Sequence, residues 1–170
     1  MLTSTGALCA RGSFSDVEKE PSLSILDVET TGLDPAFSRV VECAVVTCSS
    51  EGELLEEWSS LISVPGADEI GAGWLHGITR STLEEAPGFA EVAGEIAERL
   101  RNTVVVGHVV AFDLSHLRAE FRRIGAAFPD LEGASVCTRE VALACLPSGS
   151  RTLAAVCARL GVVREDAHTA

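Results

Sequence analysis

The first strongly patterned stretch of the chain runs from Leu23 to Leu33 and reads LSILDVETTGL. A short apolar run delivers two carboxylates and then breaks at a Thr-Thr-Gly sequence. This pattern predicts a buried strand with acid groups at its exposed carboxyl end. Because side chains alternate between the two faces of a strand, Asp27 and Glu29 should point the same way, opposite to Leu26 and Val28.

The other apolar runs predict four more strands and four helices. Val40 to Thr47 and Leu54 to Ile62 are joined by the turn signal SSEGE, which is typical of a hairpin. The wholly apolar run from Thr103 to Gly107 is typical of a central strand buried on both faces. A loop-rich stretch is expected from Pro65 to Thr82, followed by an amphipathic helix from Phe89 to Leu100. A second helix should run from about Phe112 to Ile124 and end at Gly125, and a brief strand should run from Ala134 to Cys137. Two more helices are expected: one capped by Thr138 that runs through Cys145, and a last one, LAAVCARL, capped by Thr152 and ended by Gly161.

This order of elements, β-β-β-α-β-α-β-α-α, predicts an α/β fold in which a mixed five-stranded sheet carries helices on its faces. Residues 1–21 have few large apolar side chains and are expected to form a flexible N-terminal tail. Residues 22–170 are expected to form one domain, since 170 residues suffice for one good core and not for two.

Composition narrows the possible functions. The net charge of −12 argues against a protein that grips duplex nucleic acid through its own Lys and Arg, although an acidic cleft can bind phosphates through metal ions. The six cysteines include no Cys-x-x-Cys pair, which argues against a zinc site and favours a reducing compartment. The sequence shows no secretion signal and no apolar run near the roughly 20 residues that span a bilayer, so we expect a cytoplasmic protein.

Asp27 and Glu29 predict a place where two like charges are held side by side. Such a pair is costly unless something neutralises it, and a hard divalent cation with oxygen ligands is the usual partner. The alternative is a strand end whose acids are simply solvated, which is common.

Two later segments could complete such a site. Asp113 lies in HVVAFD, which follows the central strand and opens a helix, at the edge where strand ends gather in an α/β sheet. It could instead be a first-turn acid favoured by the helix dipole. Near the C-terminus, His168 is expected at a helix start, where it could act as a general base or be an ordinary surface histidine.

Taken in order, DVETTGLDP, LHGIT with the following APGF, GHVVAFD and the late His168 resemble the motifs of the DEDDh family of 3′–5′ exonucleases. This family includes the proofreading epsilon subunit of bacterial DNA polymerase III. The resemblance covers residues 22–170 and implies a ribonuclease-H-like three-layer fold. A related branch has Tyr in place of the final His, and this chain contains no Tyr.

The resemblance implies hydrolysis of phosphodiesters at the 3′ ends of single-stranded nucleic acid, most simply DNA, with two Mg²⁺ or Mn²⁺ ions. Asp27 would bridge both ions, Glu29 would hold the ion that activates water, Asp113 would support the other ion, and His168 would accept the proton of the attacking water. It also implies a substrate-binding set of Thr30, Thr31, Gly32, Leu33, His76 and Phe112, with the backbone from Thr30 to Leu33 cradling the terminal nucleotide. Leu33 and Phe112 could equally be core residues, and His76 could be a hydrogen-bonding residue of its loop.

Two departures from the family pattern shape these expectations. Val109 stands where the family usually has Asn. The family's final motif also continues to a fourth carboxylate three residues beyond the position of Ala170, where this sequence ends. We therefore expect the C-terminal helix to be missing and activity to be weak, with Asp166 an unlikely substitute. The alternative function is a catalytically silent module of the same fold that binds nucleic acid or a polymerase, and a DNA polymerase subunit is the implied protein partner.

Overall fold

The computed structural model describes residues 22–66, 76–131 and 135–163. The expected tail (1–21), Asp166 and His168 lie outside the described residues, so the expectations about them stay predictions. Within the described ranges, no helix is both long enough and apolar enough to cross a bilayer.

The described strands form one mixed sheet of five, as the sequence predicts, and their order is β3-β2-β1-β4-β5. β1 and β2 are antiparallel, as are β2 and β3, so the first three strands form a meander. β4 runs parallel to β1, and β5 runs parallel to β4. The strands are β1 (Ser22–Thr30), β2 (Val40–Cys48), β3 (Leu54–Leu61), β4 (Thr103–Gly107) and β5 (Val136–Cys137).

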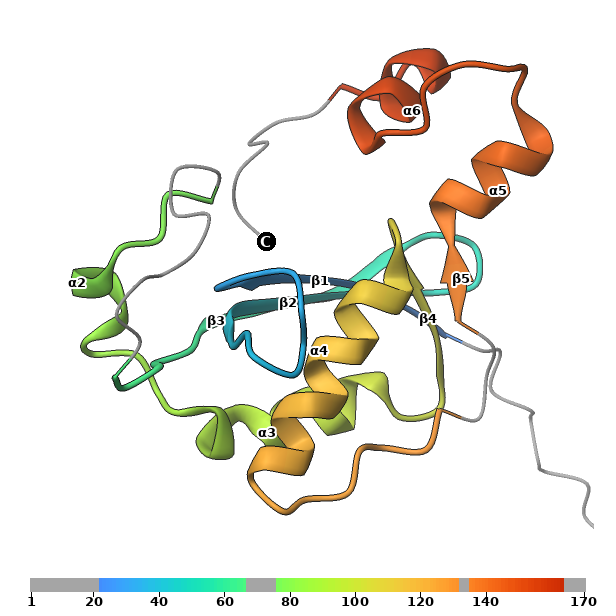
Figure 1. Cartoon of the computed structure of the whole chain (residues 1–170). Helices are drawn as coiled ribbons and strands as arrows, with labels where there is room; N and C mark the ends of the chain where they lie inside the picture. Colours follow the sequence, from blue (N-terminus) through green and yellow to red (C-terminus); the bar gives the residue numbers. More distant parts are fainter. Residues whose placement is uncertain (1–21, 67–75, 132–134, 164–170) are drawn as a thin grey trace, which may run out of the picture.

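Two long helices, α3 and α4, lie side by side against one face of this sheet (Figure 1). Their apolar faces join the strands in the main core, where Leu26, Ile96 and Leu117 are almost completely buried. After β5 the described chain continues through α5 and α6, which lie apart from α3 (Figure 1). The described helices are α2 (Arg80–Leu83), α3 (Phe89–Leu100), α4 (Val110–Arg123), α5 (Thr138–Cys145) and α6 (Leu153–Leu160).

Several predicted helix ends are confirmed. The Thr152 hydroxyl accepts a hydrogen bond from the backbone N–H of Ala155, which caps α6. Gly161 follows α6 with a φ of 71°, and Gly125 follows α4 with a φ of 69°. Glycine occupies this left-handed region without steric cost, which is why it ends helices so often.

Two local expectations were wrong and a third was incomplete. The stretch from Pro65 to Thr82 was expected to be loop-rich, and α2 begins near its end, with Thr79 as its N-cap. Thr138 is the first residue of α5 rather than its cap, and its hydroxyl instead lies 2.9 Å from Nδ1 of His108. α4 begins at Val110, two residues earlier than predicted, because Val109 adopts a left-handed conformation that turns the chain directly from β4 into the helix.

Because β4 is short, the carboxyl end of β1 has no β4 residue paired with it. β4 pairs with β1 only as far as Ile25 opposite Val106, so the last residues of β1 extend beyond it. Gly107 ends β4, and a Cβ there would lie 3.1 Å from the carbonyl oxygen of Leu26 and 3.1 Å from Cβ of Val110. The absence of a side chain thus lets the start of α4 sit tightly against β1.

Candidate active site

Asp113 reaches β1 through the space that β4 leaves open. Its Oδ1 accepts a hydrogen bond of 3.1 Å from the backbone N–H of Val28, between Asp27 and Glu29 in the sequence. This N–H belongs to the part of β1 that extends past β4, so the carboxylate takes the place of a strand partner. Asp113 is only 3% exposed. The expected convergence of its segment with the two acids of β1 is therefore present in the fold.

The two acids of β1 lie on the face predicted for them. Leu26 and Val28 are buried in the main core, whereas Asp27 is exposed and Glu29 is partly exposed. Although Asp27 keeps contact with solvent, the protein packed around it removes enough hydration to raise the pKa of its carboxyl. The alternation of side chains along the strand thus separates apolar residues from acids.

The acids raise one another's proton affinity. Loss of hydration, followed by the negative charges of Asp27 and Glu42, raises the pKa of Glu29 to about 7. Loss of hydration also raises the pKa of Asp113 to about 7, with Asp27 the next contributor, while the N–H of Val28 opposes this rise. Perturbations of this kind are common where a protein binds a cation or performs proton transfer.

Glu42 is a neighbouring acid that the sequence reasoning missed. It lies directly opposite Glu29 in the pairing of β1 with β2 and is almost buried. Burial, together with the charges of Asp113, Asp27 and Glu42, raises the pKa of the Cys43 thiol strongly, so this thiol stays protonated. The available signal was a charged residue inside the apolar run VVECAVV, which is unusual for a buried strand.

The ion pairs found among the described residues do not involve Asp27, Glu29 or Asp113. The ion pairs of the described residues join Arg39 and Arg123 to Glu120, and Arg99 to Glu56 and Glu95. Within the same ranges, His, Cys, Asp and Glu side chains do not form a group of three or more already arranged to hold a metal ion. The three acids are therefore coupled by charge without forming a complete ligand shell on their own.

The loop after β1 uses part of the backbone that was expected to cradle a nucleotide. The N–H of Thr31 donates to the carbonyl of Arg39, and the Thr31 hydroxyl accepts from the N–H of Arg39. The Thr30 hydroxyl donates to the carbonyl of Gly32. At Gly32 a Cβ would lie 3.0 Å from the hydroxyl of Ser38, so a side chain would crowd the loop. Thr31 therefore supports the loop with its N–H.

The other expected substrate contacts differ in exposure. Leu33 is 86% exposed, so the alternative of a core position is wrong for it. Phe112 is partly buried against the main core, and its ring lies 4.2 Å from the ring of His116. His76 is buried, and its Nδ1 accepts from the N–H of Ile78, which agrees with the alternative of a local hydrogen-bonding role.

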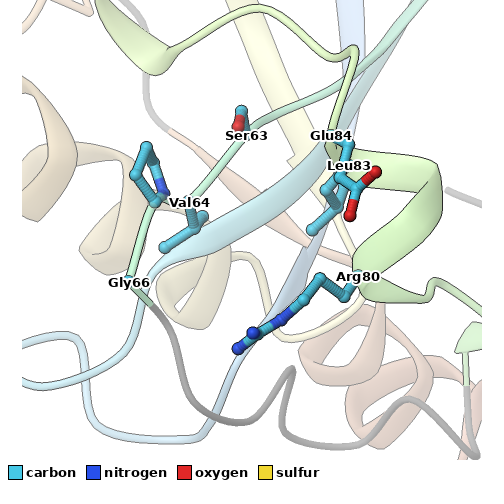
Figure 2. Close-up of a pocket in the computed structure, with 7 residues that line it drawn as sticks. Ser63, Val64, Gly66, Arg80, Leu83 and Glu84 are labelled. Atoms are coloured by element: carbon cyan, nitrogen blue, oxygen red, sulfur yellow. The ribbon is translucent and has the colours of Figure 1, made fainter.

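A cavity of about 160 Å³ lies between the segment after β3 and α2, and Arg80, Val64 and Leu83 are among its lining residues (Figure 2). Its lining includes none of the predicted site residues that the structure describes. A second hollow, beside His108, is lined by residues from the start of α4 and from the α5–α6 region. Both nitrogens of His108 lie 2.9 Å from a partner, the hydroxyl of Thr138 and the carbonyl of Arg151, so this histidine links β4 to the later helices.

Comparison with known proteins identifies the family. The family model described as RNase_T, exonuclease, matches residues 24–170. The chain belongs to this exonuclease family. Its fold is the one expected from the motifs, because the structure of Escherichia coli exonuclease I in complex with a dT13 oligonucleotide superposes with a TM-score of 0.79 at 20% identity, covering 88% of this chain and 38% of that one.

Several curated relatives are named as PolC-type DNA polymerase III or as the epsilon subunit of DNA polymerase III. The PolC-type DNA polymerase III of Thermotoga petrophila is 28% identical over 150 residues, which cover 88% of this chain and 11% of that protein. The epsilon subunit of DNA polymerase III of Treponema pallidum is 30% identical over 104 residues, covering 61% of this chain and 48% of that protein. The chain thus spans about a tenth of the length of the PolC-type relatives.

Proposed function

We propose that this chain is a metal-dependent 3′–5′ exonuclease domain that releases nucleotides from the 3′ ends of single-stranded DNA. The observation that carries the proposal is the placement of Asp113 against β1, beside Asp27 and Glu29, where the described part of the chain supplies no cation. Membership of the exonuclease family supports it, as do relatives named for DNA polymerase III. Exonuclease I with a bound dT13 oligonucleotide has the same fold.

The donor set suits hard divalent cations. Carboxylate oxygens are the ligands that Mg²⁺ and Mn²⁺ prefer. Burial, followed by repulsion from neighbouring acids, raises the pKa values of Glu29 and Asp113, and a bound cation would relieve that repulsion. Asp27, Glu29 and Asp113 would hold the ions. When bound, such ions neutralise the carboxylates and offer positive charge to a scissile phosphate and its attacking water.

Other groups of the chain would orient a metal ligand, contact the terminal base and accept a proton. The N–H of Val28 fixes one oxygen of Asp113, so this carboxylate is oriented before substrate arrives. Leu33 is exposed immediately beyond the strand and is available to contact the terminal base. His168, outside the described residues, is proposed to accept the proton of the attacking water.

Mn²⁺ binding and nucleotide release test this proposal together. Millimolar Mn²⁺ should raise the melting temperature of the wild-type chain, because a ligand that binds only the folded state stabilises it. The same Mn²⁺ should promote release of mononucleotides from a 5′-labelled dT10 strand. Asp27→Asn should lose both effects, whereas Asp130→Asn, which changes an exposed acid that forms no described ion pair, should keep both.

The possible outcomes separate the enzyme from a silent module. An equal rise in melting temperature for wild type and Asp27→Asn would remove the acids of β1 from the metal site. A rise in melting temperature confined to proteins with Asp27, but without nucleotide release, would instead favour a catalytically silent module that binds nucleic acid or a polymerase subunit. Release that starts from the 5′ end would contradict the proposed polarity.

A further inference from the structure

The loop between β1 and β2 presents an aromatic side chain that the proposed chemistry does not use. Phe37 is 87% exposed, and Leu33, on the other limb of the same loop, is 86% exposed. The other phenylalanines among the described residues are treated differently: Phe89 and Phe121 are buried, and Phe112 and Phe128 pack against the core. Single exposed apolar residues are ordinary, so exposure alone assigns nothing to Phe37.

The loop that carries Phe37 is held firmly. The carbonyl of Asp34 accepts from the N–H groups of Phe37 and Ser38, at 3.0 and 2.8 Å, and from the Ser38 hydroxyl at 2.7 Å. A carboxylate oxygen of Asp34 also accepts from the N–H of Ala36. The base of the loop is closed by the paired hydrogen bonds between Thr31 and Arg39. The exposed ring of Phe37 therefore stands on a well-supported turn.

α4 fixes the same loop from below. Glu120 is fully buried, and its carboxylate accepts from Arg39, from Arg123 and from the N–H of Val40. Arg123 also donates to the carbonyls of Pro35 and Ala36, at 2.6 and 3.1 Å. A surface whose shape is fixed in advance loses less conformational freedom when it binds a partner.

Two arginine side chains beside the loop could donate hydrogen bonds to phosphates. Arg39 and Arg123 share the single carboxylate of Glu120, and their side chains keep 33% and 28% exposure. The carboxylate of Asp34 accepts from the backbone of the loop and adds a second negative charge, so the arginines contribute directed N–H donors rather than a net positive charge. Two partly exposed arginine side chains beside an exposed aromatic ring thus offer donors for phosphates and a face for a base.

The position of the loop indicates which nucleotide of a bound DNA strand could reach Phe37. Arg123, which holds Ala36, lies ten residues after Asp113 on α4. Ten residues of α-helix span about 15 Å, which is longer than a single nucleotide. A base bound near the Arg123 end of α4, where Pro35 and Ala36 are held, would belong to a nucleotide upstream of the one whose phosphodiester lies at the acids.

We propose that Phe37 is a stacking platform for a nucleobase upstream of the 3′-terminal nucleotide, so that this site distinguishes a single strand from a mononucleotide. The inference rests on the proposed function and adds a specificity-determining residue to it. Base stacking on an aromatic ring tolerates any base sequence and supplies affinity without reading the base edges.

Binding of single strands of defined length tests the platform. Fluorescence anisotropy would measure the Kd of 5′-fluorescein dT10, with phosphorothioate linkages at its 3′ end to slow cleavage, in the presence of Mn²⁺. Phe37→Ala should weaken binding of dT10 about tenfold, since loss of one stacked base has an effect of this size. Competition by unlabelled dTMP should be unchanged, and Phe37→Trp should bind dT10 at least as tightly as wild type.

Two controls separate stacking from a general effect. Leu143→Ala removes an exposed apolar side chain from α5 and should leave the Kd of dT10 unchanged. A set of dT10 strands, each with one abasic position among the four nucleotides at the 3′ end, should include one strand for which Phe37→Ala causes no further loss. Such non-additivity identifies the base that contacts the ring.

The failures of the two proposals are distinguishable. Wild-type binding of dT10 with an unchanged Kd in Phe37→Ala would overturn the platform and leave the exonuclease proposal standing. An equal loss for dT10 and dTMP would also overturn it, because the ring would then act on the terminal nucleotide or on the fold. If the wild-type chain fails to bind dT10 at all, the platform and the single-strand substrate fall together.

Discussion

Helix α4 carries two buried carboxylates whose surroundings differ: cations of the chain surround one, and other acids surround the other. Glu120 is 0% exposed and Asp113 is 3% exposed. Glu120 receives two guanidinium groups and a backbone N–H, so the chain itself supplies the compensating charge. Asp113 receives the N–H of Val28 and faces Asp27 and Glu29, which add negative charge.

This difference separates a structural carboxylate from a functional one. A buried charge that the fold neutralises can hold elements together, as Glu120 holds the β1–β2 loop to α4. A buried acid that faces other acids lowers the stability of the folded state through lost hydration and charge repulsion. Binding of a proton or of a cation from solution relieves this repulsion. The pairing of like charges at Asp113 is therefore the clearest sign of function in the described part of the molecule.

The largest expected effect is the loss of the compensated carboxylate. Glu120→Ala should lower the free energy of unfolding by about 3 kcal/mol, because it leaves two arginines and an N–H without their shared acceptor. The arginines are partly exposed and can be hydrated, which limits the loss. Glu56→Ala, which breaks an exposed ion pair with Arg99, should cost less than about 1 kcal/mol.

Urea unfolding in EDTA would measure both variants. The same experiment would include the affinity of Glu120→Ala for dT10, which should fall because the loop carrying Phe37 loses its support. Equal stabilities for Glu120→Ala and Glu56→Ala would mean that the buried network contributes no more than a surface pair, and the comparison with Asp113 would lose its basis.

The second effect should have the opposite sign. In EDTA at pH 8, Asp113→Asn should raise the free energy of unfolding by about 1 kcal/mol, because it removes a buried charge that other acids repel while keeping an acceptor for the N–H of Val28. The same substitution should abolish the stabilisation by Mn²⁺ and the release of nucleotides. A loss of stability in EDTA would show that the Asp113 charge is already neutralised in the folded chain.

The pH dependence of wild type follows from the same repulsion. Burial and neighbouring charges raise the pKa values of Glu29 and Asp113 from 4.5 and 3.8 to about 7. Between pH ~4 and ~7 the folded state therefore holds protons that the unfolded state has released, so stability should decrease as pH rises through this window. In EDTA, Asp113→Asn should show a shallower decrease than wild type across the same range.

The sequence predicted the uncompensated acids more readily than the compensated one. Asp27 and Glu29 end an apolar run, and Asp113 opens a helix, so periodicity places all three near strand ends. Glu120 looks like any polar residue of an amphipathic helix, and only the long-range contact with Arg39 reveals its role. Glu42 was missed because a register between strands is needed to place it opposite Glu29.

Helix ends show the same division between local and distant information. Thr152 and Gly161 were predicted because capping is decided by a few neighbouring residues. The early start of α4 could not be predicted, because nothing local favours a β-branched residue in a left-handed conformation. The conformation of Val109 depends on the tight contact between Gly107, β1 and the first turn of the helix.

The smallest expected effect concerns this strained turn, which sets where α4 and hence Asp113 begin. Val109 has a φ of 71° and Asn102 a φ of 57°, and they are the non-glycine residues with positive φ in the described ranges. Asn tolerates this region, whereas a β-branched side chain clashes with its own backbone. Val109→Asn should therefore raise the free energy of unfolding by about 1 kcal/mol, and Asn102→Val should lower it by a similar amount. Urea unfolding of the two reciprocal variants in EDTA would measure these changes. A loss of stability in Val109→Asn would mean that the packing of the valine side chain, which lines the hollow beside His108, outweighs its backbone strain.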